Sequence, residues 1–219
     1  MTAIQFRPQS HFGFPRPSAP KFTARAARIL PTAALVTTAA VSIILNHAFA
    51  DQLTSRSQMD PPFEADGLSL SRAKAEDVPA IENIVKKAYT MYIERIGKPP
   101  APMTADYTEL LVSHDVFVLT LTSTNEIVGS IVLREDHSSN SIKINNLVVD
   151  TAAQGRGFGG SLMRYAEAFA KLRSRPALTL FTNAMMYENL ALYPKMGFKE
   201  IERKSEDGYQ RVYFRKELL

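Results

Sequence analysis

The pattern of apolar and polar positions predicts alternating strand and helix segments beyond residue 66. Apolar residues recur there either at every second position, as in strands, or at every third and fourth position, as in amphipathic helices. The predicted strands are 68–71, 116–122, 127–133, 142–149, 178–182, 199–203 and 211–216. The predicted helices are 76–96, 104–111, 159–172 and 188–196.

The order of these segments indicates the fold class. Strands that follow one another through short turns pair antiparallel, whereas the helix between strands 142–149 and 178–182 allows one parallel pair. The sequence therefore predicts an α/β (α+β) domain with a mixed central sheet of about seven strands, flanked by four helices.

Local signals mark the boundaries of the first two helices. Pro79 suits a first helical turn, Gly97 suits a helix end, and Thr104 is the predicted N-cap of the second helix. The apolar stripe of the first helix runs through Ile81, Ile84, Val85, Ala88 and Tyr92. This stripe predicts which face of the helix lies on the sheet.

Composition and charge exclude several function classes. The 219 residues are 45% hydrophobic and 22% charged, which fits one globular domain with an appendage. The absence of Cys excludes disulfides, Cys-ligated metals and thiol nucleophiles. The net charge of +4 comes from the first 58 residues, which hold six Lys and Arg against one acidic residue. The remainder is close to neutral, so no nucleic-acid partner is expected.

Residues 1–50 have the character of a targeting or membrane-type leader. They contain no acidic residue, and positions 29–50 contain no formal charge. The apolar part 33–45 followed by Ala48-Phe49-Ala50 fits a signal peptide with its cleavage site. A mitochondrial presequence and a weakly hydrophobic membrane anchor at 29–50 remain open.

A mis-chosen start codon is a further reading of this leader, because translation from Met59 would still yield a complete domain. Residues 51–66 read as a linker, since they contain Pro61, Pro62 and many polar side chains. The predicted organisation is therefore a leader or extension at 1–50, a linker at 51–66 and one domain at 67–219.

The glycine-rich segment Gln154–Gly160 lies between a predicted strand and a predicted helix. Glycines let backbone amides approach a ligand closely, the start of a helix favours an anion, and Arg156 adds a positive charge. A phosphate or pyrophosphate is the expected occupant. A dinucleotide site is disfavoured, because no acidic residue lies between Glu167 and Glu188 to hold a ribose, and no Lys-Ser or Lys-Thr of a P-loop follows.

Two motifs together resemble the GNAT superfamily of acetyl-CoA-dependent N-acetyltransferases over most of residues 68–219. Gln154-Gly155-Arg156-Gly157-Phe158-Gly159 fits the family's phosphate-binding loop, and Asn189 to Phe198 resembles its second motif. The resemblance implies transfer of the acetyl group of acetyl-CoA directly to a primary amine of a small molecule or protein, without a metal. Acetyl-CoA would be the co-substrate.

The resemblance also implies site residues. The residues expected to bind coenzyme A are Leu147, Val148, Val149, Gln154, Gly155, Arg156, Gly157, Phe158, Gly159, Gly160 and Asn189. Tyr193 would protonate the leaving thiolate, and amides at Leu147 or Val148 would stabilise the oxyanion. Many members carry Glu on the fourth strand, whereas this chain has Asn145 and Asn146, so a water held by these amides is expected to relay the proton. Other candidate bases are Glu94, Asp106, His114 and Glu135.

The acceptor is expected to contact the first two helices and the turn 205–209. The residues predicted there are Tyr89, Tyr92, Arg95, Tyr107 and Tyr209. Because Arg95 continues the apolar stripe, we expect it to face the cleft and bind an anionic group of the acceptor. The alternative is an ion pair of Arg95 with Asp106 or Glu109 that ties the helices together.

Two other functions and several cellular questions stay open from the sequence. The alternatives are a non-catalytic acyl-CoA sensor and a membrane-tethered interaction module. Membrane association through 29–50 and a homodimer are also open. Since acetyl-CoA is expected inside cells or organelles, the catalytic domain is expected in the cytoplasm or an organelle interior.

Overall fold

The computed structural model of the chain describes residues 60–218, which form a seven-stranded sheet. The strand order is β1-β2-β3-β4-β5-β7-β6. The strands are β1 (Leu68–Arg72), β2 (Asp115–Leu121), β3 (Glu126–Asp136), β4 (Ser141–Val149), β5 (Ala177–Asn183), β6 (Lys199–Glu206) and β7 (Tyr209–Glu217).

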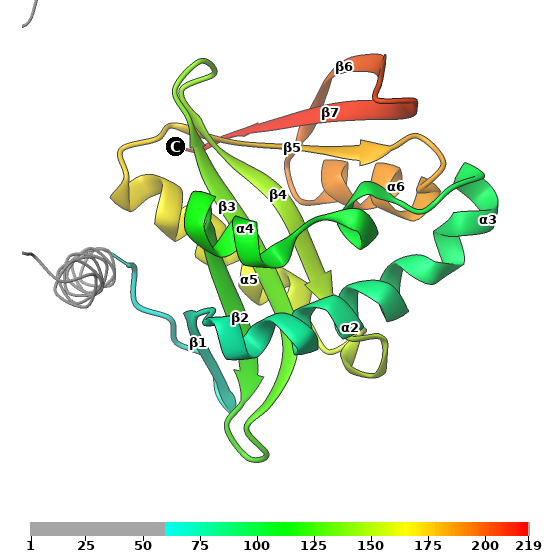
Figure 1. The fold of residues 1–219 in the computed structure, drawn as a ribbon. Helices are drawn as coiled ribbons and strands as arrows, with labels where there is room; N and C mark the ends of the chain where they lie inside the picture. The colour runs from blue at the N-terminus through cyan, green and yellow to red at the C-terminus, as the bar shows by residue number, and fades with distance from the viewer. Residues whose placement is uncertain (1–59, 219) are drawn as a thin grey trace, which may run out of the picture. The chain divides into compact units, whose positions relative to one another are not determined.

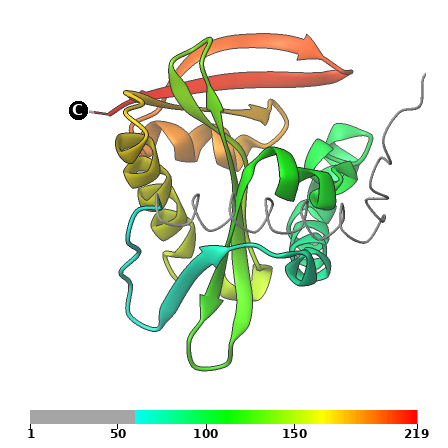
Figure 2. The same ribbon diagram turned by 60° about the vertical axis from the view of Figure 1, so that its left-hand side comes forward.

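Helices cover both faces of this sheet (Figures 1 and 2). The α-helices are α2 (Val78–Tyr89), α3 (Ile93–Ile96), α4 (Tyr107–Ser113), α5 (Phe158–Leu172) and α6 (Tyr187–Lys195). Short 3₁₀ turns lie at Ala75–Asp77, Thr90–Tyr92, Ala101–Thr104 and Thr151–Ala153. Helices α2 and α4 lie on one face, and α5 and α6 lie on the other (Figure 2).

Two hydrophobic clusters hold these layers together. One joins α5 to the sheet, and its fully buried members include Phe117, Phe169 and Leu178. The other joins α2 and α4 to the opposite face, through residues such as Ile81 and Val132. Because β4 contributes Ile144 to the first cluster and Val148 to the second, this strand is fixed from both sides.

Strand β4 separates from β5 halfway along its length. The two strands are parallel, and their pairing is confined to Ile142–Ile144 against Leu178–Leu180. All other neighbouring strands pair antiparallel. The register of β3 with β4 shifts next to Asn145, which has no opposite residue and so forms a β-bulge. Beyond this bulge, the β5-facing edge of β4 is open.

The predicted fold is confirmed in its order of elements, whereas several predicted boundaries are wrong. The first predicted helix is interrupted by the 3₁₀ turn at Thr90–Tyr92. It ends at Gly97, which adopts the left-handed conformation with a φ of 80° that favours glycine. The second helix begins at Tyr107 rather than 104, because the Asp106 side chain accepts from the Glu109 amide at its N-cap. Strand β3 extends to Asp136.

The predicted leader at 1–50 and most of the linker lie outside the described residues, so both stay predictions. Within the described part of the chain, no helix is long and apolar enough to cross a membrane.

Candidate active site

A cavity of about 430 Å³ lies where β4 and β5 diverge. Its walls come from α2, the loop before α4, the open half of β4, the start of α5, the end of β5, and α6. The predicted site residues among its lining are Tyr89, Tyr92, Tyr107, Asn145, Leu147, Val148, Val149, Gln154, Gly159, Gly160, Asn189, Tyr193 and Tyr209. The fold thus brings together 13 predicted residues from helices, strands and loops that are separate in the sequence.

The open edge of β4 presents unpaired backbone groups to this cavity. The Asp150 amide donates to the Val128 carbonyl of β3. Along a strand, successive backbone amides point alternately to the two neighbouring strands, so the amide of Val148, two residues earlier, also points toward β3. The amides of Leu147 and Val149 then point to the other edge, where β5 offers no partner. Of the two predicted oxyanion donors, Leu147 is therefore correctly oriented, whereas the Val148 amide is committed to the sheet.

The glycine-rich segment forms the entrance to α5. Gly155 and Gly157 have φ values of 77° and 85°, a region that side chains disfavour. No side chain of the described segment caps α5, so the amides of its first turn, at Phe158 to Gly160, are free to donate to an anion. Gly159 and Gly160 line the cavity, and this places the amides beside it.

Four residues of this predicted loop, Gly155, Arg156, Gly157 and Phe158, do not line the cavity. Phe158 is buried in the core under α5, so only its backbone amide is available to a ligand. The guanidinium of Arg156 lies 4.7 Å from the Phe158 ring centroid, on the exposed side of the loop. Its charge therefore lies at the helix start, as expected for an anion site.

Helix α6 supplies two polar side chains to the cavity. The Asn189 amide donates to the Thr182 hydroxyl at 3.1 Å, which ties α6 to the end of β5. The Tyr193 ring packs against Phe198 and Phe214, with centroids 5.9 and 5.4 Å away. The Tyr193 hydroxyl hydrogen-bonds to no residue of the described segment, and burial raises its pKa to about 12. Tyr193 is thus a protonated, unengaged donor at neutral pH.

A chain of hydrogen bonds links α2, β4 and the loop before α4. The Tyr89 hydroxyl donates to Oδ1 of Asn146 at 2.8 Å, and Nδ2 of Asn146 donates to the Tyr107 hydroxyl at 3.0 Å. The Tyr107 hydroxyl donates to the Pro102 carbonyl at 3.2 Å. All four residues line the cavity. Each end of the Asn146 amide therefore already has one partner, and one N–H and one lone pair are left for a further ligand such as the predicted relay water.

The neighbouring Asn145 is held by a different partner. Its Nδ2 lies 2.8 Å from Nε2 of His114, whose Nδ1 lies 2.8 Å from the Ser113 hydroxyl. Oδ1 of Asn145 is buried and has no partner among the described residues. Burial, together with the charges of Arg134 and Lys143, lowers the pKa of His114, so this imidazole is neutral at neutral pH.

None of the candidate bases lines the cavity, and its described lining contains no Asp, Glu, His or Lys. Asp106 is the N-cap of α4, and His114 is the C-cap of the same helix. Glu135 forms an ion pair with Arg175 at 2.9 Å, and Glu94 lies on the exposed side of α3. No cluster of three or more metal-ligating acids or His occurs among residues 60–218.

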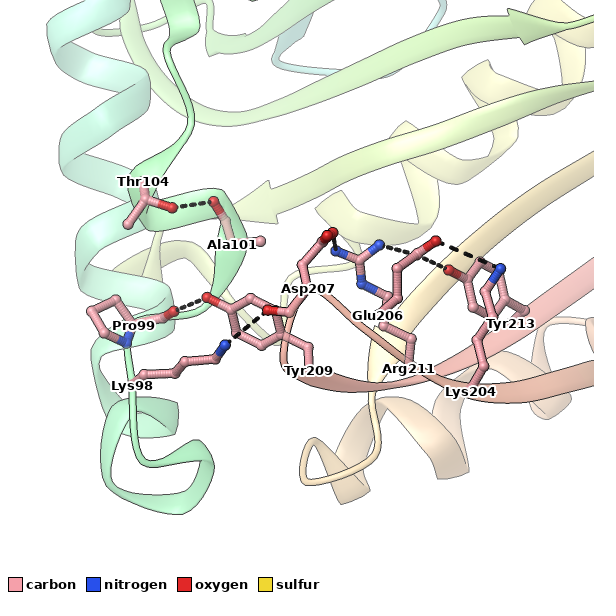
Figure 3. Close-up of polar contacts among 10 residues, drawn as sticks. All are labelled: Lys98, Pro99, Ala101, Thr104, Lys204, Glu206, Asp207, Tyr209, Arg211 and Tyr213. Atoms are coloured by element: carbon pink, nitrogen blue, oxygen red, sulfur yellow. Dashed lines mark hydrogen bonds and ion pairs between the residues drawn. The ribbon is translucent and has the colours of Figure 1, made fainter. Parts of the chain in front are cut away.

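The β6–β7 turn contacts the loop after α3 (Figure 3). The Tyr209 hydroxyl donates to the Pro99 carbonyl at 2.7 Å, and Nζ of Lys98 donates to the Asp207 carbonyl at 3.0 Å. Asp207 and Gly208 have φ values of 52° and 73°, which suit a two-residue turn between twisted strands. The hydrogen bond to Pro99 thus fixes the position of the Tyr209 hydroxyl, and Tyr209 lines the cavity.

Arg211 adds the one cationic side chain of the described lining, and its charge is balanced. Its guanidinium donates to Glu206 and, at 2.9 Å, to Asp207 (Figure 3). It also lies 4.5 Å from the Phe181 ring centroid. The cavity thus carries hydroxyls, amides and apolar surface, with its single cation already paired.

The predicted inward orientation of Arg95 is wrong. Arg95 is exposed, lies outside the cavity lining, and forms an ion pair with Glu188 at 2.8 Å. The interruption of the first helix at Thr90–Tyr92 changes the direction of the stripe, which explains why the extrapolated register failed. The alternative partners Asp106 and Glu109 do not pair with Arg95 either.

Sequence reasoning missed several lining residues. Among them are Pro102, Met163, Phe181, Thr182, Met186 and Arg211. Thr182 and Asn183 end β5 just where β4 diverges, and polar residues at the end of a central strand were an available signal. Nothing local distinguishes Met163 or Met186 from ordinary core residues.

Comparison with known proteins agrees with this geometry. The model of the family described as "Acetyltransferase (GNAT) domain" matches residues 113–200. A curated relative, the mycothiol acetyltransferase of Jonesia denitrificans, is 39% identical over 77 residues. That match covers 35% of this chain and 24% of the relative, so the chain matches about a quarter of the relative's length.

Solved structures share the fold at low sequence identity. The ribosomal-protein-S18-alanine N-acetyltransferase from Escherichia coli has a TM-score of 0.55 and 19% identity, over 69% of this chain and 94% of that one. A GNAT family acetyltransferase from Elizabethkingia anophelis, solved with acetyl-CoA bound, has a TM-score of 0.52 and 20% identity, over 70% and 100%. These matches confirm the predicted fold.

Proposed function

Because the model of a GNAT acetyltransferase domain matches residues 113–200, we propose that the chain is a member of this family and transfers the acetyl group of acetyl-CoA directly to a primary amine. The observation that carries this proposal is the open edge of β4 beside the uncapped, glycine-rich start of α5. No other part of the described chain offers backbone donors for an extended amide arm and for a pyrophosphate side by side. Neither a non-catalytic sensor nor a tethered module has an observation in its favour.

The coenzyme would be held mainly by backbone groups. The amides at Phe158 to Gly160 suit the pyrophosphate, and the free edge at Leu147 and Val149 suits the amides of the pantetheine arm as an added strand. Gln154 supports this edge, because its Nε2 donates to the Val149 carbonyl at 3.2 Å. When bound, acetyl-CoA supplies the reactive thioester.

The reaction joins the amine nitrogen to the thioester carbonyl carbon and breaks the bond from that carbon to sulfur. The Leu147 amide is placed to stabilise the oxyanion that forms in between. The amine loses one proton to water, and the departing thiolate takes one proton from the Tyr193 hydroxyl, which water then reprotonates. The products are the acetylated amine and coenzyme A with a free thiol.

The acceptor we propose is a primary amine with an apolar or aromatic body, bound as the neutral free base. The acceptor side of the cavity is formed by Tyr89, Tyr92, Tyr107, Tyr209 and Pro100, without a carboxylate to hold an ammonium group. Desolvating an unpaired ammonium costs several kcal/mol, at order of magnitude, whereas a neutral amine needs only hydrogen-bond partners. Polycationic acceptors are therefore disfavoured, and a small molecule or an exposed peptide amine of this kind fits.

The cellular location remains a proposal based on the co-substrate. We place the catalytic domain in the cytoplasm or an organelle interior, where acetyl-CoA is expected, and propose that residues 1–50 act as a targeting or membrane-associated leader. Mass spectrometry of the natural N-terminus tests this. A start near residue 51 indicates cleavage, a start at Met59 removes the leader altogether, and an intact Met1 supports retention.

The direct test of the activity combines binding and turnover. Acetyl-CoA at a hundredfold excess over its Kd should raise the free energy of unfolding by about 2.7 kcal/mol, and acetyl transfer to arylalkylamines should release thiol. The Tyr193→Phe variant should lose about a hundredfold in kcat while it keeps its affinity for acetyl-CoA, because the ring contacts remain. The control is Tyr187→Phe, an exposed tyrosine outside the cavity. Equal loss in both variants, or no binding of acetyl-CoA, would refute the assignment.

A further inference from the structure

We propose that Tyr89 is the positioning residue for the attacking amine, and that its hydroxyl oxygen accepts a hydrogen bond from the amine N–H. The inference rests on the proposed acetyl transfer and goes beyond it, because it assigns the direction of a hydrogen-bond chain and the group that orients the nucleophile. The chain runs from Tyr89 through Asn146 and Tyr107 to the carbonyl of Pro102.

The carbonyl of Pro102 determines the direction of this chain. A carbonyl oxygen can only accept, so the contact at 3.2 Å requires Tyr107 to donate its single proton there. The Tyr107 oxygen can then only accept from Asn146, which places the NH₂ group of Asn146 toward Tyr107. The Asn146 carbonyl must therefore face Tyr89.

This direction leaves Tyr89 with a defined role. Since the Asn146 carbonyl accepts the Tyr89 proton at 2.8 Å, the Tyr89 oxygen has only lone pairs left for the cavity. An oxygen with this restriction binds groups that carry a hydrogen, such as a primary amine. It gives no hydrogen bond to a carbonyl or an ether at the same position, so it selects the nucleophile over the thioester.

Tyr89 lies where such a contact is useful. Tyr89 and Tyr193 both line the cavity, and negative charge on Tyr193 would raise the pKa of Tyr89, so the two phenol groups lie within electrostatic reach. Burial is the largest cause that raises the pKa of Tyr89, and the residue therefore stays protonated. Tyr89 can orient the amine but cannot remove its proton. Tyr193, whose proton is unengaged, is the matching donor for the sulfur side.

The test uses 2-phenylethylamine as the probe, and the full chain as the protein. The Tyr89→Phe variant should weaken binding of this amine about tenfold in the presence of coenzyme A, and should lower kcat/KM for the amine by about the same factor. The KM for acetyl-CoA should not change, whereas the thermal midpoint should fall slightly, because Oδ1 of Asn146 loses the Tyr89 proton. Tyr187→Phe is the matched control, because Tyr187 is exposed and outside the cavity.

A second variant tests the direction of the chain itself. In Tyr107→Phe the link to Pro102 is lost, so Asn146 is free to rotate and the Tyr89 proton is free to turn toward the cavity. This variant should also weaken amine binding, because the Tyr89 oxygen no longer presents only lone pairs to the cavity. If it does not fold, Tyr89→Phe alone decides the proposal.

The outcomes separate this inference from the proposed function. Unchanged amine affinity and kcat/KM in Tyr89→Phe overturns the inference while wild-type turnover upholds acetyl transfer. Weakened amine binding in Tyr89→Phe, with no turnover by the wild type, upholds the positioning role and overturns the transferase assignment. A thermal midpoint that falls together with affinity for acetyl-CoA identifies a structural role for Tyr89 and also overturns the inference.

Discussion

Alkaline titration of buried tyrosines should progressively destabilise this domain above about pH 10. Burial raises the pKa of Tyr107 to about 12 and that of Tyr193 to about 12, against 10.0 in an exposed tyrosine. Burial also raises the pKa of Tyr89 and of Tyr165. Three of these four residues form the cavity, so the same pH range tests the fold and the site together.

The sign and size follow from proton linkage. Below about pH 10 these phenols are protonated in both states, and their contribution to stability is intact. Above that pH the unfolded chain loses their protons while the folded chain keeps them until about pH 12, so the free energy of unfolding falls. Each such tyrosine lowers it by about 1.4 kcal/mol per pH unit, so a two-unit shift at Tyr107 amounts to about 2.7 kcal/mol. Two shifts of this size total about 5 kcal/mol, against about 5–15 kcal/mol for a typical domain.

Urea unfolding followed by circular dichroism between about pH 8 and about pH 11 measures this slope. The Tyr107→Phe variant should show a shallower slope by about 1.4 kcal/mol per pH unit, provided it folds. Tyr187→Phe, with 56% of the residue exposed, should keep the wild-type slope. A wild-type stability that stays constant up to about pH 11 would show that these phenols are solvated, and the reasoning on the cavity would fail with it.

Three further substitutions have defined outcomes. Gly157→Ala should weaken coenzyme A binding at least about tenfold in a calorimetric titration, because φ is 85° at the start of α5 and a side chain there strains the backbone that holds the amides. The control is Gly67→Ala, which has a φ of 71° and open space around it, and which should carry similar strain without loss of binding. Gly129→Ala should lower the free energy of unfolding by about 1–3 kcal/mol, as measured with urea, since the added Cβ would lie 2.9 Å from the Val148 carbonyl oxygen. An unchanged urea midpoint would mean that β3 and β4 are free to separate. Arg95→Ala should change the free energy of unfolding by less than about 1 kcal/mol and leave the KM for the acceptor within about threefold of the wild type, because its ion pair is exposed. A loss of kcat/KM for acidic amines alone would instead show that Arg95 binds the acceptor.

Most of the fold was predictable from the sequence because it depends on local patterns. The apolar alternation of 142–149 and the 3.6-residue stripe of 159–172 each specify an element and its buried face, and the observed elements differ by one residue at most. The prediction failed where a local rule competed with another one. Thr104 and Asp106 are both acceptable N-caps, and only the Asp106 side chain reaches the amide of residue 109.

The site was predictable to the extent that it is made from backbone. The glycine-rich entrance to α5 and the open edge of β4 follow from a short motif and from strand order. The side-chain contacts were not predictable, because they join residues far apart in sequence. Tyr89 and Asn146 are separated by 57 positions, and Arg95 and Glu188 by 93. No periodicity along one helix specifies such partners.

The absence of a carboxylate from the described cavity lining has a consistent physical explanation. A resident base is needed when the nucleophile arrives protonated, whereas in the proposed function a cavity of phenols and amides favours the amine as its free base, since an ammonium would lose hydration without gaining a counter-ion. The proton is then left in bulk water before binding, or passes to water during attack. Asn145 and Asn146 fit this arrangement, because an added carboxylate at their position would stabilise the ammonium form that cannot react. The raised pKa values of Tyr89, Tyr107 and Tyr193 keep these phenols neutral in the same surroundings. The tyrosines of the cavity therefore stay protonated over the pH range in which the acceptor amine itself loses its proton.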